Sequence, residues 1–186
     1  LDAEGAAAHM RPTRLLGGSY TPHCAAVHPA RLVRGMAEVI ERRGAVIHER
    51  TPVERIDGTT LHTPAGRVRA SVVVRATEAF TATLPGHRRD IAPVYSLMIA
   101  TEPLPAEVFD EIGLGARETF NDARRMVIYG QRTADDRLAF GGRGAPYHFG
   151  SRIRPANDLH AGVHASLHET LRDLFPAIGD ATITHR

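Results

Sequence analysis

The sequence predicts an α/β segment followed by an α+β lobe, and two patterns carry this prediction. Residues 28–77 predict, in this order, a helix, a short strand, a small antiparallel meander and a continuous β-branched run. Beyond Gly86, alternating apolar and polar residues indicate antiparallel strands, and a long amphipathic helix follows them. A helix between buried strands is typical of an α/β layer, whereas helices set to one side of antiparallel strands define an α+β layer.

The first strong element is a helix over residues 29–43. Pro29 suits the first helical position, because its missing N–H would be unpaired there in any case. Gly44 is a favourable residue to end the helix, and His28 is expected to cap its start. The apolar positions that recur at helical spacing are Leu32, Val33, Met36, Ala37 and Ile40.

Short strands follow this helix. Residues 45–49 are too few for a second helix and predict a strand, as do residues 53–56. Residues 59–69 predict a hairpin around a Pro-Ala-Gly turn. The β-branched run at residues 72–74 suits a strand that is buried on both faces, as in a parallel sheet.

The second half of the chain predicts an antiparallel sheet with helices, whereas residues 1–27 carry only weak structural signals. Expected strands cover residues 93–102, 126–132, 138–142 and 181–185. Residues 106–112 predict one or two helical turns, and residues 157–175 predict a long helix. The apolar stripe of that helix comprises Leu159, Val163, Leu167, Leu171 and Leu174.

Composition excludes several classes of function. Of the 186 residues, 42% are hydrophobic and 24% are charged, as in ordinary soluble domains. The formal net charge is only +2 and no run of five or more like charges occurs, so we expect no nucleic-acid partner. No apolar run is long enough to span a membrane, and the single Cys24 suits a reducing cytoplasm, the localisation we expect.

Six short motifs occur in a familiar order. They are HPARLVRG at residues 28–35, TPV at 51–53, VVRAT at 73–77, MIATEPL at 98–104, FGGRG at 140–144 and LFP at 174–176. In their order and spacing the chain resembles the D-amino-acid oxidase superfamily of FAD-dependent oxidoreductases, which includes the glycine and sarcosine oxidases. Within it, the nearest likeness is to the γ-glutamylputrescine oxidoreductase type.

This resemblance implies two lobes: a partial Rossmann-like FAD lobe and an antiparallel-sheet substrate lobe. Residues 1–27 would form a connecting segment. Residues 28–88 would belong to the FAD-binding lobe, and residues 89–186 would belong to the substrate-binding lobe. The glycine-rich phosphate loop that opens such FAD lobes is not in the sequence. We therefore expect an internal fragment, truncated before the C-terminal FAD segment and inactive by itself.

The resemblance also implies cofactor-binding residues. Val53 matches a position whose backbone contacts the adenine of FAD, while Ala76 and Thr77 match the point where a strand passes the ribose and phosphates. The next residue is Glu78, whose carboxylate would be unfavourable beside pyrophosphate. Either Glu78 turns away, or this chain binds FAD less well.

The implied reaction oxidises a C–N bond of an amine or amino acid by hydride transfer to flavin. The cofactor carries that chemistry, so no catalytic acid or base is assigned. Tyr129, on a strand expected to face the flavin, is the first candidate for the substrate pocket, followed by Tyr95 and Arg143. The expected partner is a small amine or amino acid, and the oligomeric state is left open.

Two alternatives compete with this interpretation. The chain could be an isolated, non-catalytic substrate-lobe module that binds a ligand or partner. It could also bind zinc through His160, His164 and His168, which recur every four residues, although the ligands that would complete such a site are missing and we expect no metal.

Overall fold

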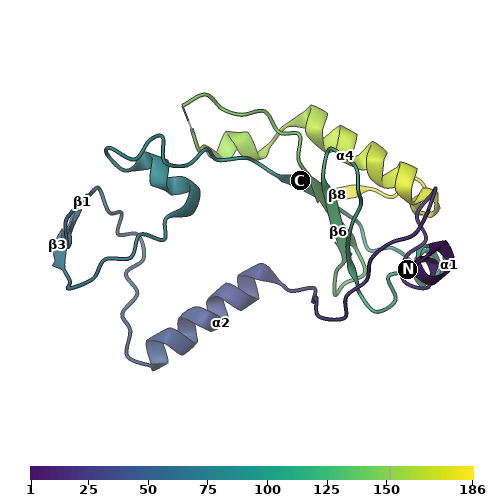
Figure 1. The fold of residues 1–186 in the computed structure, drawn as a ribbon, viewed down its shortest axis with the longest axis horizontal. Helices are drawn as coiled ribbons and strands as arrows, with labels where there is room; N and C mark the ends of the chain where they lie inside the picture. The colour runs from purple at the N-terminus through teal and green to yellow at the C-terminus, as the bar shows by residue number, and fades with distance from the viewer. Residues whose placement is uncertain (151) are drawn as a thin grey trace. The chain divides into compact units, whose positions relative to one another are not determined.

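The computed structural model describes residues 1–150 and 152–186, which form two compact units (Figure 1). The sheet unit comprises residues 1–26, 95–146 and 155–186. The hairpin unit comprises residues 27–94 and 147–154. The lobe boundaries implied by the resemblance concern the whole enzyme and stay a prediction.

The sheet unit is built on a five-stranded sheet in the order β5-β6-β7-β4-β8, in which every neighbouring pair is antiparallel. The tight β6–β7 connection is closed by a hydrogen bond from the N–H of Thr133 to the carbonyl of Arg137, at 2.9 Å. This sheet confirms the antiparallel lobe that the sequence predicts. Its strands are β4 Leu97–Thr101, β5 Thr119–Asn121, β6 Ile128–Arg132, β7 Leu138–Gly142 and β8 Ile183–His185.

One face of this sheet is covered by helix α4, Ala161–Leu174, which lies against β4 and β7 (Figure 1). Successive strand residues point to opposite faces, so the buried side chains alternate along β4, whereas Phe140, Gly141 and Gly142 of β7 are all buried. The helix begins later than the predicted residue 157, because residues Pro155–Asp158 form a separate 3₁₀ turn. The ring of His160 then caps α4 by accepting the N–H of Val163 at 3.2 Å.

Further elements complete the core of the sheet unit. Helix α3, Ala106–Ile112, and the 3₁₀ turn η3, Pro176–Ile178, pack beside each other. The ring of Phe120 meets that of Phe175 edge-on at 5.6 Å between centroids. The N-terminal segment, which carries only weak signals in the sequence, contains the short helix α1, Ala3–Ala7. It is attached to the rest of the unit by Thr13, whose N–H donates to the Leu174 carbonyl at 2.9 Å.

The hairpin unit contains helix α2, Pro29–Arg42, a three-stranded antiparallel sheet and the 3₁₀ helix η1, Glu78–Thr83. The predicted helix and hairpin are therefore confirmed, with Gly44 at a φ of 91° directly after the helix end. No helix in the described part of the chain is long and apolar enough to cross a membrane. The strands are β1 Arg55–Asp57, β2 Thr60–Thr63 and β3 Gly66–Arg69.

Two predicted strands of the hairpin unit are absent. Residues 45–49 and 72–74 are extended or irregular, and no strand among the described residues pairs with them. Val74 is 81% exposed rather than buried on both faces. A strand of a parallel sheet is held by the strands beside it, so an apolar β-branched run does not form one without those neighbours.

Candidate functional site

The face of the large sheet opposite α4 carries the candidate site, centred on Tyr129 of β6. Tyr129 lies opposite Gly141 of β7, and Gly141 lies opposite Met98 of β4. A Cβ atom built on Gly141 would come within 2.6 Å of the Tyr129 ring and 2.8 Å of the Met98 Cγ. Only a glycine at this position therefore lets the Tyr129 ring lie across β7.

The phenol of Tyr129 is held at its far end by Ser96, which precedes β4. The Tyr129 hydroxyl lies 2.8 Å from the Ser96 Oγ. The same Oγ donates to the carbonyl of Gly142 at 3.2 Å. Side chains from β6 and from the start of β4 thus form one hydrogen-bonded chain across β7.

The other two substrate-pocket candidates do not join Tyr129. Tyr95 packs against the hydrophobic core, and its hydroxyl accepts a hydrogen bond from the Asn157 Nδ2 at 3.4 Å. Arg143 follows β7 and is exposed; its backbone N–H donates to the Val127 carbonyl at 3.0 Å. The structure therefore gives Tyr129 a defined setting on the open face and does not gather the three residues into one pocket.

Sequence reasoning missed Ser96 and Gly141. The signal that could have found them is strand parity, since Ser96 and Met98 alternate with the buried Leu97 and therefore belong to the same face. The pairing partner of each residue depends on register, which a single strand sequence does not fix.

The candidate cofactor residues lie in the hairpin unit. Val53 precedes β1 and is half-buried, while Ala76 is exposed. The hydroxyl of Thr77 lies 2.8 Å from that of the buried Thr81. Ala76 is exposed and carries a small side chain, which is compatible with a nucleotide lying against it.

Glu78 is turned back onto its own backbone. Its φ of 45° opens the 3₁₀ helix η1, and its carboxylate accepts the N–H of Ala79. The carboxylate is thus folded against the start of η1, and which of the two outcomes for FAD binding applies stays a prediction.

A network of charges fixes the segment around these residues. The carboxylate of Asp90 lies 2.7 Å from the His87 Nδ1 and 3.2 Å from the Arg75 guanidinium. The hydrogen bond from His87, helped by Arg75, lowers the pKa of Asp90 below its ordinary value. Arg75 directly precedes Ala76, so this network restrains the backbone of a candidate cofactor residue.

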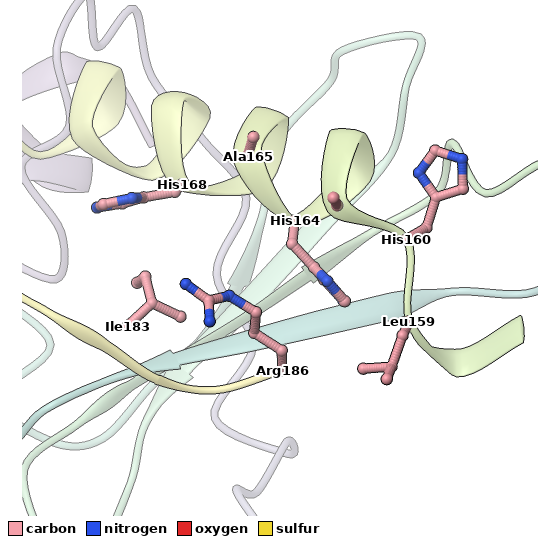
Figure 2. Close-up of a pocket in the computed structure, with 8 residues that line it drawn as sticks. Leu159, His160, His164, Ala165, His168, Ile183 and Arg186 are labelled. Carbon is pink, nitrogen blue, oxygen red and sulfur yellow. The ribbon is translucent and has the colours of Figure 1, made fainter. Parts of the chain in front are cut away.

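A pocket of about 610 Å³ lies between the first half of α4 and the end of the chain (Figure 2). His164, on its wall, is 5% exposed, and burial lowers its pKa, with smaller contributions from Arg186 and His160. The Nε2 atoms of His164 and His168 are buried without a hydrogen-bond partner in the described residues.

The histidines of this pocket bear on the zinc alternative. Figure 2 shows the imidazole rings of His160, His164 and His168 spread along α4 rather than gathered about one point. Within residues 1–150 and 152–186, no group of three or more histidine, cysteine or acidic side chains could hold a metal ion. The zinc alternative therefore gains no support from the geometry.

The chain is similar in sequence or in fold to several known proteins. A probable oxidoreductase, OrdL, from Haemophilus influenzae is 30% identical over 142 residues, covering 72% of this chain and 33% of that protein. Glycine oxidase from Geobacillus kaustophilus shares the fold with a TM-score of 0.70 at 23% identity, over 99% of this chain and 48% of that one. L-proline dehydrogenase from P. horikoshii gives a TM-score of 0.61 at 17% identity, over 84% of this chain and 41% of that one.

The chain thus spans a third to a half of the length of these proteins. The likeness to glycine oxidase confirms the predicted fold class, a mixture of helices and antiparallel sheet. The family model for FAD dependent oxidoreductases, DAO, matches residues 1–186, the whole of the sequence. The chain therefore belongs to the DAO family of FAD-dependent oxidoreductases.

Proposed function

We propose that the full-length protein oxidises the C–N bond of a small amine or amino acid. The observation that carries this proposal is the open face of the large sheet, where the ring of Tyr129 lies over Gly141 and its hydroxyl is held by Ser96. Two proteins of similar fold support the substrate class, because their names state glycine and L-proline as what they act on.

In this reaction the carbon beside the neutral amine loses a hydride, and the nitrogen lone pair forms the C=N bond of an iminium ion, which water then hydrolyses to a carbonyl compound and ammonia or an amine, with release of a proton. FAD, when bound, supplies the hydride acceptor. Tyr129 orients the amine by a hydrogen bond, and Met98 beside it keeps water from one side of the reacting carbon. No proton transfer by a side chain is needed at the hydride step if the amine arrives neutral.

Within the hairpin unit, we assign the adenine end of FAD to the backbone of Val53, and the ribose and phosphates to Ala76 and Thr77. The geometry that supports this assignment is the exposure of Ala76 and the folded carboxylate of Glu78. Residues 1–186 contain no glycine-rich phosphate loop, so we propose that they do not turn over substrate by themselves. The single, exposed Cys24 suits a reducing cytoplasm as the site of action.

The test uses the full-length protein with its flavin bound. Under anaerobic conditions, glycine, L-proline or putrescine is added, and the visible band of oxidised flavin is followed. We expect at least one of these amines to bleach the band. Bleaching by the hydroxy acids glycolate or lactate, with no response to any amine, would contradict the proposal.

The rival function, a non-catalytic binding module, is favoured by one observation: the sheet unit has its own closed core. The full-length preparation used in the previous test also distinguishes the enzyme from the non-catalytic binding module. A full-length protein that carries no flavin after purification and after incubation with FAD, yet binds amines, would favour the module.

A further inference from the structure

The hydrogen bonds around Ser96 fix the direction of the Tyr129 hydroxyl. A serine hydroxyl carries a single proton, and a backbone carbonyl carries none. The contact between the Ser96 Oγ and the Gly142 oxygen, at 3.2 Å, can therefore form only if Ser96 donates. Its proton is then used, so the 2.8 Å contact with Tyr129 must be a hydrogen bond in which the phenol donates.

The reverse arrangement satisfies fewer groups. If Ser96 donated to Tyr129, its bond to the Gly142 carbonyl would be lost. Tyr129 could not move to a different partner by shifting sideways, because its ring is seated over Gly141 between β6 and Met98. Among the described residues, Ser96 is the only hydrogen-bond partner of the Tyr129 hydroxyl.

A phenol that donates its proton to Ser96 has lone pairs left on its oxygen. These can accept a hydrogen bond from the open side of the sheet, but the phenol has no second proton to give. A ligand atom that meets Tyr129 must then carry a hydrogen. An amine or ammonium nitrogen satisfies this condition, whereas a carboxylate or ether oxygen does not.

We infer that Ser96 is a positioning residue that takes the Tyr129 proton and makes the phenol oxygen an acceptor for the N–H of the substrate. This inference rests on the proposed function, because it takes Tyr129 to line the substrate site. It deepens that function by assigning Tyr129 to the amine end of the substrate rather than to a carboxylate.

The first experiment reads the direction of the hydrogen bond without any ligand. In tyrosine, the intensity ratio of the Raman Fermi doublet distinguishes a phenol that donates from one that accepts. The signal of Tyr129 is isolated as the difference between the full-length parent and Tyr129→Phe. We expect a donor signature in the parent and in Ser96→Thr, which keeps the hydroxyl, and its loss in Ser96→Ala.

The second experiment compares two ligands of nearly equal shape, pyrrole-2-carboxylate and furan-2-carboxylate, which differ in one ring atom. The first presents an N–H and the second an ether oxygen, and neither is a substrate for oxidation at the ring. Dissociation constants come from perturbation of the bound-flavin spectrum. We expect the parent to bind the pyrrole about three- to tenfold more tightly, the range for one net hydrogen bond.

Ser96→Ala and Tyr129→Phe should each bring that preference close to one, whereas Ser96→Thr should keep it. Ser166→Ala is the matched control: it makes the same chemical change on an exposed position of α4 and should leave the preference unchanged. An unaltered preference in Ser96→Ala, or a parent that prefers the furan, would overturn the inference.

These outcomes are separable from failure of the proposed function. If no amine bleaches the flavin but the ligand preference and the Raman signature behave as expected, the reaction is wrong and the positioning role stands. If amines bleach the flavin while Ser96→Ala behaves like the parent in both measurements, the reaction stands and the positioning role is wrong.

Discussion

The two units of this chain both contain apolar residues in regular patterns, but they bury these residues to different extents. The hydrophobic core cluster lies within the sheet unit, where Leu138, Phe140 and Leu171 are fully buried, whereas Leu84 is a buried leucine of the hairpin unit outside that cluster. In the hairpin unit, α2 has a strong apolar stripe and not one buried residue. Periodicity thus tells which face of an element is apolar, and it does not tell what covers that face.

This difference separates two sources of order. The sheet unit is held by side chains removed from water, at about 25 cal/mol per Å² of apolar surface. The hairpin unit relies on local hydrogen bonds, such as the pairing of β2 with β1 and β3 and the Asp90 network. Local order of this kind contributes little cooperative stability, so the two units should respond differently to the same type of substitution.

The largest expected contrast is between Phe140→Ala and Met36→Ala. Phe140 is 0% exposed, so its truncation should cost about 3–5 kcal/mol in free energy of unfolding. Met36, on α2, is 54% exposed, and its truncation should change that free energy by no more than about 0.5 kcal/mol. Urea unfolding of residues 1–186, followed by circular dichroism, measures both.

The contrast between the two units would be contradicted if Met36→Ala lowered the free energy of unfolding as much as Phe140→Ala does. That result would mean that the apolar face of α2 is covered in solution, by a second copy for example. Repeating the measurement at several protein concentrations would reveal such a copy, because a dimer gains stability with concentration.

A second contrast lies within the sheet unit, between adjacent glycines on its two faces. Gly141→Ala places a methyl group against the Tyr129 ring and should cost about 1–3 kcal/mol in free energy of unfolding. Gly142→Ala faces Leu167 of α4, whose Cδ2 would lie 3.0 Å from the new Cβ. A comparable loss of stability is expected there.

The two glycine variants differ in what they do to the site. Gly141→Ala should change the Raman signature of Tyr129, since the ring can no longer lie over β7, whereas Gly142→Ala should leave it as in the parent. Equal signatures in the two variants would contradict the placement of Tyr129 on the open face.

The sequence predicted the sheet unit well, and physical reasons explain where the prediction stopped. Alternation correctly separated the buried residues of β4 from the more exposed ones, because that pattern is a property of the strand alone. The strands expected at residues 45–49 and 72–74 failed because their apolar character needs neighbouring strands that the described chain does not supply. The same limit applies to α2, whose helix was predicted while the exposure of its apolar face was not.

The site was predicted by residue type and not by arrangement. Tyr129 could be chosen because its strand was identifiable, but Ser96 and Gly141 contact it across register pairs that only the folded sheet defines. Tyr95 had the same appeal in the sequence, yet it packs against the core instead. The chemistry of a side chain identifies a candidate site residue, but the pairing of the strands determines which candidates contact each other in the folded protein.

A smaller effect compares the two helix caps of the same chemistry. His160 caps α4 of the sheet unit at 3.2 Å, and His28 caps α2 of the hairpin unit at 3.4 Å, each through its Nδ1. His160→Ala should cost about 1 kcal/mol in free energy of unfolding, because loss of a cap typically costs that much. His28→Ala should instead speed amide hydrogen exchange in the first turn of α2, with little change in the global transition. A matching loss of global stability in both variants would show that the units unfold as one.

The smallest effect concerns exposed carboxylates, one in each unit. Hydrogen bonds from the Thr133 hydroxyl and the Arg137 guanidinium lower the pKa of Asp135, in the β6–β7 turn, from 3.8 to about 2. Because the folded pKa is below the unfolded one, the stabilisation is complete above pH 3.8 and is lost as the pH falls through about 2. A carboxyl-carbon NMR titration should show this low pKa of Asp135, and Thr133→Ala should raise it.

For Asp90 of the hairpin unit, His87→Ala should raise the pKa in the same way. If Asp90 already titrates at its ordinary value in the parent while Asp135 does not, the polar network of the hairpin unit is less ordered than that of the sheet unit, and the contrast between the units extends from their cores to their surfaces.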